Sequence, residues 1–439
     1  MLIMQQGIRV LTATMLALLV GSAAATETSA SSAEQPLPSR LPLNELRVFA
    51  EAFDRVSSAY VEEIDDRTLL ENAIKGMLSQ LDPHSAYLDR ESFSDLQEDT
   101  TGNYGGVGLE VSMDDGFVRI ITPMDGTPAD KAGVKPGDLI IQLDDQPIKG
   151  MSLNDAIDAM RGAPGSAIRL TLVREGETQP FEISLTREVI NVASVRQRLL
   201  GNGYGYIRIA QFQSNTGTEV ADAVTELNSE GKLFGLVLDL RNNPGGILQS
   251  AVAVSDVFMD DGLIVYTAGR LPNSDMRFSA TSPDATNGVP IVVLVNEGTA
   301  SASEIVAGAL QDHHRAVIMG VTTFGKGSVQ TILPLNNEKA IKLTTALYFT
   351  PNGRSIQAEG IVPDVWVDRS TVTPAKQNPF NIKEKNLPGH LANTGEPGTE
   401  TQSTRGGDNL AVTDYQLNEA LNLLKGLTIL TTQSKQPKG

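Results

Sequence analysis

The spacing of hydrophobic residues predicts two amphipathic helices near the start of the chain. Apolar residues recur every three or four positions from Leu46 to Tyr60, as they do on one face of an α-helix. A second stretch with this period runs from Leu69 to Leu81, and Asp82-Pro83 ends it. Residues 41–98 are therefore expected to be helical. Their apolar faces need a partner, which is either the rest of the chain or a second copy.

The pattern changes to short β-type runs over residues 99–187. Strands are expected at Phe117–Ile121, Leu139–Leu143 and Ile168–Arg174, with one helix at Ser152–Arg161. This change to short strands, turns and one helix sets residues 99–187 apart from the helical region before them.

A glycine-rich loop opens this region at Gly105-Gly106-Val107-Gly108. Because glycine has no side chain, successive backbone N–H groups in such a loop can surround a carboxylate, and a peptide can then add as a strand beside the loop. The residues expected to contact that peptide are Gly106, Val107, Gly108 and Leu109 in the loop, with Ala156, Ile157 and Met160 on the helix. The apolar helix residues favour apolar C-termini. The alternative is that the glycines only form a tight turn.

Strands alternate with helices over residues 188–370. Leu233–Leu240 and Ile291–Val295 are continuous apolar runs, which is typical of strands buried on both faces. Helices are expected at Thr216–Asn228, Ala251–Phe258 and Glu304–Leu310. The region is predicted to be an α/β layered domain with parallel strands.

The two ends of the chain have different compositions. Residues 1–25 combine Arg9, a short apolar run and a small-residue end, as in a cleavable secretory signal, although an uncleaved anchor is the alternative. Residues 26–40 then form a flexible leader, and the exported protein is expected in the periplasm. Residues 371–410 are a predicted linker, and residues 411–439 contain a helix whose apolar face is expected to dock elsewhere, for example on another subunit.

Composition excludes several kinds of chemistry. The formal net charge is −18, which disfavours binding to nucleic acid. The chain has no Cys, so disulfides, thiolate metal sites and a Cys nucleophile are excluded, and its four His leave few options for a metal site or a His-based triad. We expect no metal and no cofactor.

A candidate nucleophile lies where the buried strand 291–295 joins the next helix. Ser301 and Ser303 belong to the small-residue segment Gly298–Glu304. A Ser at such a junction is exposed at the carboxyl end of the strand, beside the positive end of the helix dipole. The segment is not G-x-S-x-G, however, and either Ser could simply cap the helix.

A nucleophilic Ser needs a base, and two positions compete for this role. His313 and His314 are about 15 Å further along the same helix, and we expect them to be surface residues. Lys326 lies between two glycines, where we expect a tight hairpin that can approach Ser301. Its pKa must fall by about 3 units from about 10.4, which burial can achieve. Gln330 is expected on the same side of the strand, where it can orient the amine.

The combination of these motifs resembles the carboxy-terminal processing proteases, also called tail-specific proteases. The resemblance rests on Thr299-Ala300-Ser301-Ala302-Ser303-Glu304, on Lys326 and Gln330 after it, on the Leu238-Asp239-Leu240-Arg241-Asn242-Asn243-Pro244-Gly245-Gly246 turn, and on Thr350–Gln357. Residues 99–187, with their Ala132-Gly133-Val134 and Pro136-Gly137-Asp138 segments, resemble a PDZ domain of the bacterial protease-associated type. The resemblance covers about residues 43–368. One departure is Pro244, where many family members have a further Gly.

The resemblance implies a serine endopeptidase that recognises the C-terminus of its substrate and needs no cofactor. The implied fold is α/β, with a crotonase-like layered protease core, an inserted PDZ domain, and helical N- and C-terminal segments. The implied roles are nucleophile for Ser301, general base for Lys326, orienter for Gln330, and oxyanion donors for the N–H groups of Gly246 and Ala302. Some relatives work with an adaptor lipoprotein, which the resemblance adds as a partner. The expected location makes envelope proteins with apolar C-termini the expected substrates, and the apolar terminal helices favour assembly with further copies of the chain.

Two other functions fit part of this pattern. A non-enzymatic periplasmic adaptor would use only the PDZ domain, and an acyl-transferring enzyme would use only the crotonase-type core.

Overall fold

The computed structural model describes residues 42–124, 126–201, 203–272, 274–336, 338–373, 384, 387–391 and 410–434. The chain divides into two compact units, residues 1–70 and 71–439. The expected signal segment 1–25 and leader 26–40 lie outside the described residues, as does most of the expected linker 371–410. No helix within the described ranges has the length and apolar character needed to cross a bilayer.

The first unit contains helix α1 (Leu43–Ala59) and the start of α2 (Asp66–Ser79). Both helices lie where the hydrophobic period predicted them. Leu46 and Phe49 on α1 are exposed.

A six-stranded sheet forms the centre of the second unit. Its order is β10 (Val195–Leu199), β11 (Tyr204–Ile209), β12 (Gly235–Asp239), β15 (Ile291–Val295), β16 (Ala316–Gly320) and β19 (Val365–Trp366). All neighbouring strands are parallel except β10, which is antiparallel to β11. The parallel arrangement expected from the sequence is therefore confirmed. The apolar runs are fully buried because both faces of the sheet are covered.

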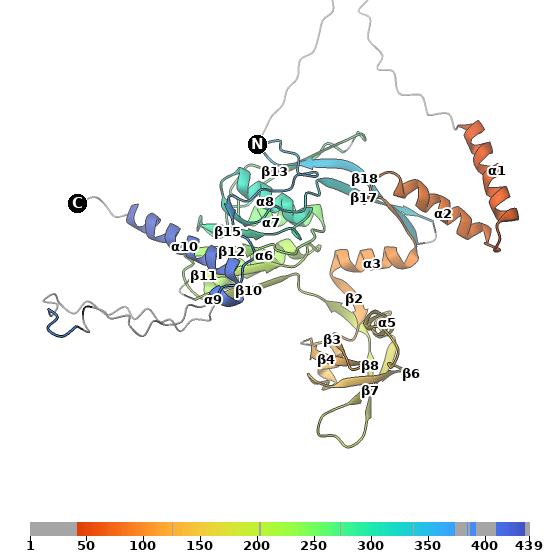
Figure 1. Cartoon of the computed structure of the whole chain (residues 1–439), viewed down its shortest axis with the longest axis horizontal. Helices are drawn as coiled ribbons and strands as arrows, with labels where there is room; N and C mark the ends of the chain where they lie inside the picture. The colour runs from red at the N-terminus through yellow and green to blue at the C-terminus, as the bar shows by residue number, and fades with distance from the viewer. Residues whose placement is uncertain are drawn as a thin grey trace, which may run out of the picture. The chain divides into compact units, whose positions relative to one another are not determined.

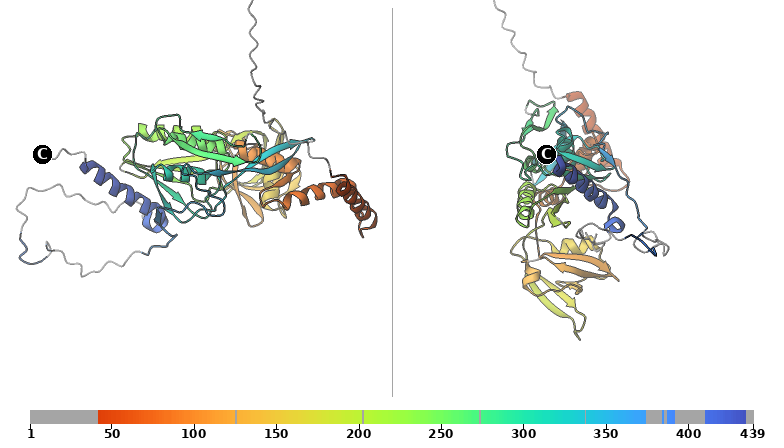
Figure 2. Two further views of the ribbon diagram at one scale, coloured as in Figure 1. Left: turned by 90° about the horizontal axis from the view of Figure 1, so that it is seen from above. Right: turned by 90° about the vertical axis from the view of Figure 1, so that its left-hand side faces the viewer.

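Alternate residues of the central strands face two different helix layers. Leu236 and Leu238 pack with helices α6 (Thr216–Ser229), α7 (Leu248–Val257) and α8 (Ala302–Asp312). Val237 faces the opposite layer, in which Leu417 and Leu424 of α10 (Tyr415–Ser434) pack after the short α9 (Leu410–Thr413). Figures 1 and 2 show α10, drawn in dark blue, beside this sheet. Its apolar face thus docks on the parallel sheet of the same chain, and not on another subunit as the sequence suggested, because this face of the sheet would otherwise be exposed.

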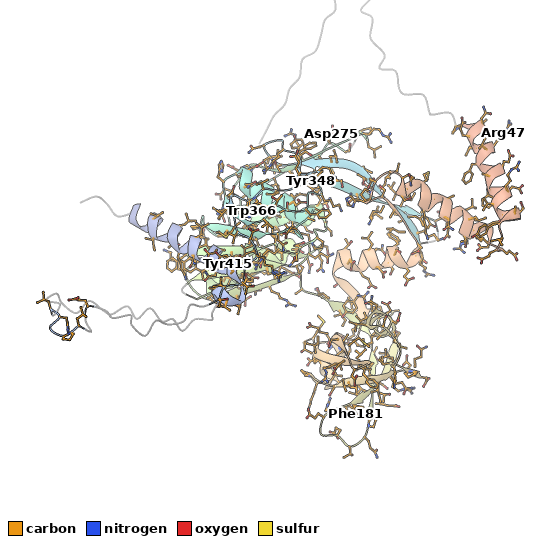
Figure 3. The ribbon with its side chains drawn as sticks, in the orientation of Figure 1. Arg47, Phe181, Asp275, Tyr348, Trp366 and Tyr415 are labelled. Carbon is orange, nitrogen blue, oxygen red and sulfur yellow. The ribbon has the colours of Figure 1, made fainter. Side chains whose placement is uncertain are left out.

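A second, antiparallel sheet carries part of the site. It contains β1 (Ala86–Leu88), β18 (Lys339–Phe349), β13 (Leu263–Gly269) and β14 (Arg277–Ser279), and β17 (Ser328–Leu335) also pairs with β18. Tyr348 of β18 is fully buried in the interior (Figure 3). Residues 321–327 lead from β16 of the parallel sheet to β17 of this second sheet. The expected tight hairpin at Lys326 is therefore wrong, since the segment connects two sheets.

Residues 107–185 form a module with its own hydrophobic core. Its sheet contains β3 (Leu109–Asp114), β4 (Phe117–Pro123), β5 (Leu139–Leu143), β6 (Gln146–Pro147), β7 (Ala167–Val173) and β8 (Phe181–Thr186), with helices α4 (Pro128–Lys131) and α5 (Leu153–Met160). The chain enters and leaves this module through β2 (Asn103–Gly106) and β9 (Glu188–Asn191), which pair with each other. Helix α3 (Arg90–Thr101) precedes β2. Ser152 and Asp155 form a reciprocal capping box that starts α5 where the sequence predicted it.

Candidate active site

The turn that follows β12 depends on two glycines. Gly245 has φ 103° and Gly246 has φ 141°, in a region of backbone conformation that favours glycine. A Cβ on Gly245 would lie 2.7 Å from the Ser301 Cβ, and one on Gly246 would lie 2.1 Å from the Phe212 carbonyl oxygen. Only glycine therefore allows this turn to approach Ser301 so closely.

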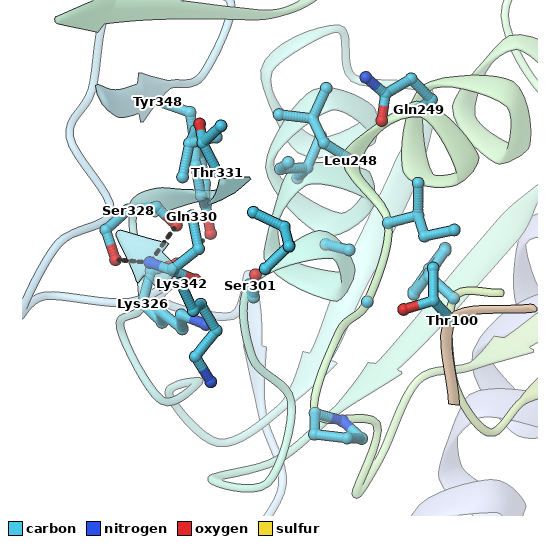
Figure 4. A pocket seen from close by; sticks show the side chains of 18 of the residues that line it. Thr100, Leu248, Gln249, Ser301, Lys326, Ser328, Gln330, Thr331, Lys342 and Tyr348 are labelled. Carbon is cyan, nitrogen blue, oxygen red and sulfur yellow. Dashed lines mark hydrogen bonds between the residues drawn. The ribbon is translucent and has the colours of Figure 1, made fainter. Parts of the chain in front are cut away.

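Ser301 lies between β15 and α8, at the N-cap position of the helix, with the strained values φ 56° and ψ −116°. Strain of this kind in a non-glycine residue is typical of functional sites. The side chain faces a cavity of 560 Å³ (Figure 4). Ser303 does not, because it is fully buried and its Oγ donates to the Asn243 carbonyl oxygen at 3.0 Å. Of the two serines considered in the sequence, only Ser301 is available to a substrate.

A buried carboxylate joins the Ser301 segment to the Lys326 segment. Glu304 Oε2 accepts hydrogen bonds from the backbone N–H of Ser301 at 2.8 Å and from the backbone N–H of Lys326 at 2.9 Å. Its Oε1 accepts from the Gly325 N–H at 2.7 Å and from the Thr323 hydroxyl at 2.5 Å. Desolvation raises the pKa of Glu304, while these donors oppose that shift. Glu304 thereby holds two segments together that are more than twenty residues apart in sequence.

Lys326 lines the same cavity as Ser301. Burial lowers the pKa of its amine, and the positive charge of Lys342 lowers it further. Glu304 and Asp82 act in the opposite direction and raise it. Among the described residues, no hydrogen bond joins the Lys326 amine to the Ser301 hydroxyl.

Gln330, the third residue of β17, also lines this cavity. Its amide nitrogen donates to Ser328 Oγ at 3.0 Å and to the Ser328 carbonyl oxygen at 3.3 Å (dashed lines in Figure 4). The register of β17 against β18 shifts between Val329 and Gln330, and Lys326 precedes the strand. A regular strand therefore does not connect Lys326 to Gln330, but both residues line the same cavity.

The two backbone groups expected to bind an oxyanion lie at the same cavity. Gly246 and Ala302 both line it. Within the described part of the chain, neither N–H donates a hydrogen bond to another group. Both donors are thus available to a bound molecule.

The histidines considered as bases lie elsewhere. His313 and His314 are exposed, as expected, and the His313 Nε2 lies 2.7 Å from the Leu263 carbonyl oxygen. Neither lines the cavity.

Sequence reasoning missed Glu304 and Tyr348. The Tyr348 hydroxyl donates to the Lys326 carbonyl oxygen. Burial and the Glu304 carboxylate raise the pKa of Tyr348 well above its usual value, and a hydrogen bond with Ser301 opposes this shift. A signal for Glu304 was present, since Ser-x-x-Glu before an apolar run is typical of a helix start. Tyr348 has no comparable signal, because it reaches the site only through the pairing of β17 with β18.

A second cavity, of 220 Å³, lies between the glycine loop and α5 of the module. Six of the seven residues expected to contact a peptide line it, namely Gly106, Val107, Gly108, Leu109, Ile157 and Met160, and Tyr104, Val111 and Arg161 complete the lining. Ala156 does not line it, because its side chain faces the core of the module. β3 has a partner only on its β4 side among the described residues, so its other edge is open beside this groove.

Comparisons with known families divide the chain into three matching segments. The peptidase family S41 matches residues 203–367, and the PDZ domain family matches residues 119–174. The N-terminal domain of the activating protease CtpB matches residues 9–92.

Several curated relatives match over most of their length. The carboxy-terminal-processing protease of Bartonella bacilliformis is 46% identical over 385 residues, which cover 87% of this chain and 88% of the relative. The carboxyl-terminal-processing protease of Synechocystis sp. is 40% identical over 311 residues, covering 69% and 72% of the two chains. The carboxy-terminal processing protease CtpA of Bacillus subtilis is 37% identical over 315 residues, covering 72% and 67%.

These matches favour neither a non-enzymatic adaptor nor an acyl-transferring enzyme. The chain belongs to the carboxy-terminal processing proteases of peptidase family S41, and it is a serine-type peptidase with a PDZ domain.

Proposed function

We propose that this protease cleaves its substrates through an acyl-enzyme formed on Ser301, with Lys326 as the general base. The observation that carries the proposal is a single cavity lined by both side chains and by two backbone N–H groups that have no partner among the described residues. A neutral amine, a hydroxyl and two converging donors are the parts that acyl transfer requires.

In the first step, the neutral amine of Lys326 takes the Ser301 proton while the hydroxyl oxygen attacks the scissile carbonyl carbon. The N–H groups of Gly246 and Ala302 stabilise the oxyanion, at about 3 kcal/mol each. Lys326 then gives its proton to the leaving amine. A water molecule, deprotonated by the same amine, releases the acyl group and restores Ser301.

Lys326 and Ser301 must move closer together for this chemistry, because no hydrogen bond joins them among the described residues. Catalytic hydrogen bonds are often long in a free enzyme and shorten when substrate binds. We propose that Gln330 Oε1 then accepts an N–H from Lys326, so that the amine lone pair points to Ser301.

The acyl-enzyme can be detected directly. We expect the protein to gain the mass of the acyl group when it is mixed with a peptide aryl ester and stopped in acid, because an activated ester acylates faster than water removes the group. Intact-mass spectrometry and peptide mapping should place the added mass on the peptide that contains Ser301. Enzyme denatured before mixing is the control. Ester hydrolysis without added mass at any quench time would contradict the covalent step.

We further propose that the groove between the glycine loop and α5 binds the C-terminus of the substrate. The N–H groups of Val107 and Gly108 donate to no acceptor among the described residues and can therefore receive the terminal carboxylate. The open edge of β3 can pair with the peptide backbone, and Ile157 and Met160 provide an apolar wall for its last side chain.

Replacing Ile157 with Glu is expected to weaken the recognition of protein tails. A carboxylate in the groove opposes both the apolar side chain and the terminal carboxylate of the substrate, so KM for a protein ending in an apolar residue should rise about 10-fold or more. The turnover of a short peptide with a blocked C-terminus should not change. The control is Asp158→Ala, which alters an exposed residue of the same helix. An unchanged KM for the protein substrate would exclude this groove.

The remaining expectations concern location, architecture and assembly. We propose that residues 1–25 are removed on export, that the substrates are envelope proteins in the periplasm, and that an adaptor lipoprotein brings the enzyme to the membrane.

We propose domain limits at 41–98, 99–187, 188–370 and 411–439, with a crotonase-like core supported by the parallel sheet between two helix layers. The uncovered apolar residues of α1, and Ile429 and Leu430 of α10, support assembly through the terminal helices.

A further inference from the structure

A tight turn after α2 packs beside the catalytic strands. The Asp82 carboxylate accepts from the backbone N–H of His84 at 2.8 Å and of Ser85 at 2.9 Å, and from the Ser85 hydroxyl at 2.6 Å. The turn leads into β1, whose Ala86 pairs with Lys342 of β18. Three hydrogen bonds thus fix the orientation of the Asp82 carboxylate, and the pairing of β1 with β18 keeps the turn next to β18.

Thr344 of β18 connects this turn to Gln330. Its hydroxyl donates to Asp82 Oδ1 at 3.1 Å, and its backbone N–H donates to Ser85 Oγ at 3.1 Å. The same hydroxyl oxygen accepts from Gln330 Nε2 at 3.4 Å. A hydroxyl has only one proton, and an ionised carboxylate can only accept, so the Thr344 oxygen can act toward Gln330 only as an acceptor.

The hydrogen bonds of Gln330 distinguish the two ends of its amide. The Ser328 carbonyl oxygen, 3.3 Å from Nε2, can only accept a hydrogen bond, so the NH₂ group must face it. Thr344 imposes the same choice because its proton is already donated to Asp82. Gln330 Oε1 accepts from no donor in the part of the chain that the structure describes, and Gln330 and Lys326 line the same cavity. The amide oxygen is therefore the end of Gln330 that remains free for the lysine.

We propose that Asp82 and Thr344 are positioning residues for catalysis, which hold the Gln330 amide with its oxygen directed to the Lys326 amine. This inference rests on the proposed Ser–Lys mechanism. Were the amide reversed, its NH₂ group would donate to the lysine lone pair that must take the Ser301 proton. The three-residue chain from Asp82 to Gln330 thus selects the amide orientation that leaves this lone pair free.

Electrostatics alone makes the opposite prediction for Asp82. The charged groups that act on Lys326 are Lys342, Glu304 and Asp82, and His84 is also close to it. The Asp82 carboxylate raises the pKa of Lys326, so its removal would leave more neutral amine near pH 7. A purely electrostatic role predicts that Asp82→Ala is at least as active as the wild type, whereas a positioning role predicts a lower kcat at every pH.

The test compares Thr344→Val, Thr344→Ser and Asp82→Ala, using an internally quenched peptide as the substrate. We expect Thr344→Val and Asp82→Ala to lower kcat about 10- to 100-fold with little change in KM, because a misplaced base costs rate and not binding. Thr344→Ser keeps the hydroxyl and should restore most of kcat. The control is Thr345→Val, which removes the neighbouring hydroxyl that bonds to Thr331 at 2.6 Å and should leave kcat close to the wild-type value.

Coupling to Gln330 decides whether the chain of hydrogen bonds is responsible. In a Gln330→Ala background, Thr344→Val should cause no further loss, since both changes remove the same interaction. Additive losses would overturn the inference, as would a wild-type kcat in Thr344→Val and in Asp82→Ala. A wild-type kcat in Gln330→Ala would instead remove the orienter from the proposed mechanism, and the inference with it. If Thr344→Val does not fold, Asp82→Ala replaces it as the variant expected to lose kcat, in both backgrounds, and Thr344→Ser remains the variant that keeps the hydroxyl.

Discussion

Replacing Ser301 with Ala is expected to lower kcat by a factor of about 10⁴ or more while the protein stays folded. The hydroxyl is the only serine oxygen of the β15–α8 junction that faces the cavity, and the change removes one atom from a half-buried position. The backbone contact of Ser301 with Glu304 does not depend on its side chain. The rate of peptide cleavage and the thermal unfolding curve measure the two effects separately.

The matched control is Ser303→Ala, two residues further along the same segment. Its hydroxyl is buried and bonded to the Asn243 carbonyl oxygen, so the change should cost about 1 kcal/mol of unfolding free energy and leave cleavage largely intact. An active Ser301→Ala enzyme, or an inactive but folded Ser303→Ala enzyme, would show that the nucleophile has been assigned to the wrong residue.

Local patterns predicted the parts of the site that lie at ends of regular elements. The apolar run Ile291–Val295 has the bounds of β15, and the small residues after it lead into α8 at Ala302. The Asn-Pro-Gly-Gly turn after β12 was recognisable for the same reason, since an apolar run followed by glycines is typical of a strand that ends in a sharp turn. Ser301 and Gly246 meet because parallel neighbouring strands β12 and β15 present their carboxyl ends at one edge.

The elements on the other side of the cavity were not predictable in this way. Lys326 is held by Glu304 and Tyr348, and Gln330 by Thr344, all through contacts that depend on the pairing of distant segments. Hydrophobic period describes neighbours along a chain, and does not indicate which strands pair across a sheet. The expected hairpin at Lys326 failed for this reason.

Helix α10 gives the complementary case. The period of its apolar residues was correct, but a period shows only that one face must be covered, not by what. The covering surface is the face of the parallel sheet that carries Val237, Val292 and Leu294. That face could not be assigned to α10 before the strand order was known.

Replacing Lys326 with Met is expected to abolish cleavage almost as fully as the loss of Ser301. Met has nearly the shape of the lysine stem but no amine, so Ser301 would keep its proton, and kcat should fall about 10³-fold or more. Lys326→Arg should be similarly inactive, because a guanidinium keeps the positive charge but does not lose its proton at working pH. Activity retained by either variant, measured with the same peptide, would exclude Lys326 as the base.

The pH dependence tests the same amine without altering the chain. Because burial and Lys342 lower the pKa of Lys326, the neutral form should accumulate below the usual pKa of a lysine, and kcat/KM should rise from about pH 6 to about pH 9.

The lowered pKa of Lys326 also affects the stability of the fold. A salt bridge stabilises the folded protein at neutral pH, whereas a buried lysine with a lowered pKa destabilises it. The Lys326 amine binds its proton more readily in the unfolded chain than in the folded one, so protonation lowers the free energy of unfolding. This loss of stability disappears once the pH exceeds the pKa of about 10.4 that lysine has in the unfolded chain. Lys326→Met should therefore be more stable than the wild type near pH 7, and the gain should shrink as the pH rises toward 10. A Met variant that is less stable at pH 7, together with a flat rate profile, would mean that the amine is solvated and charged in the working enzyme.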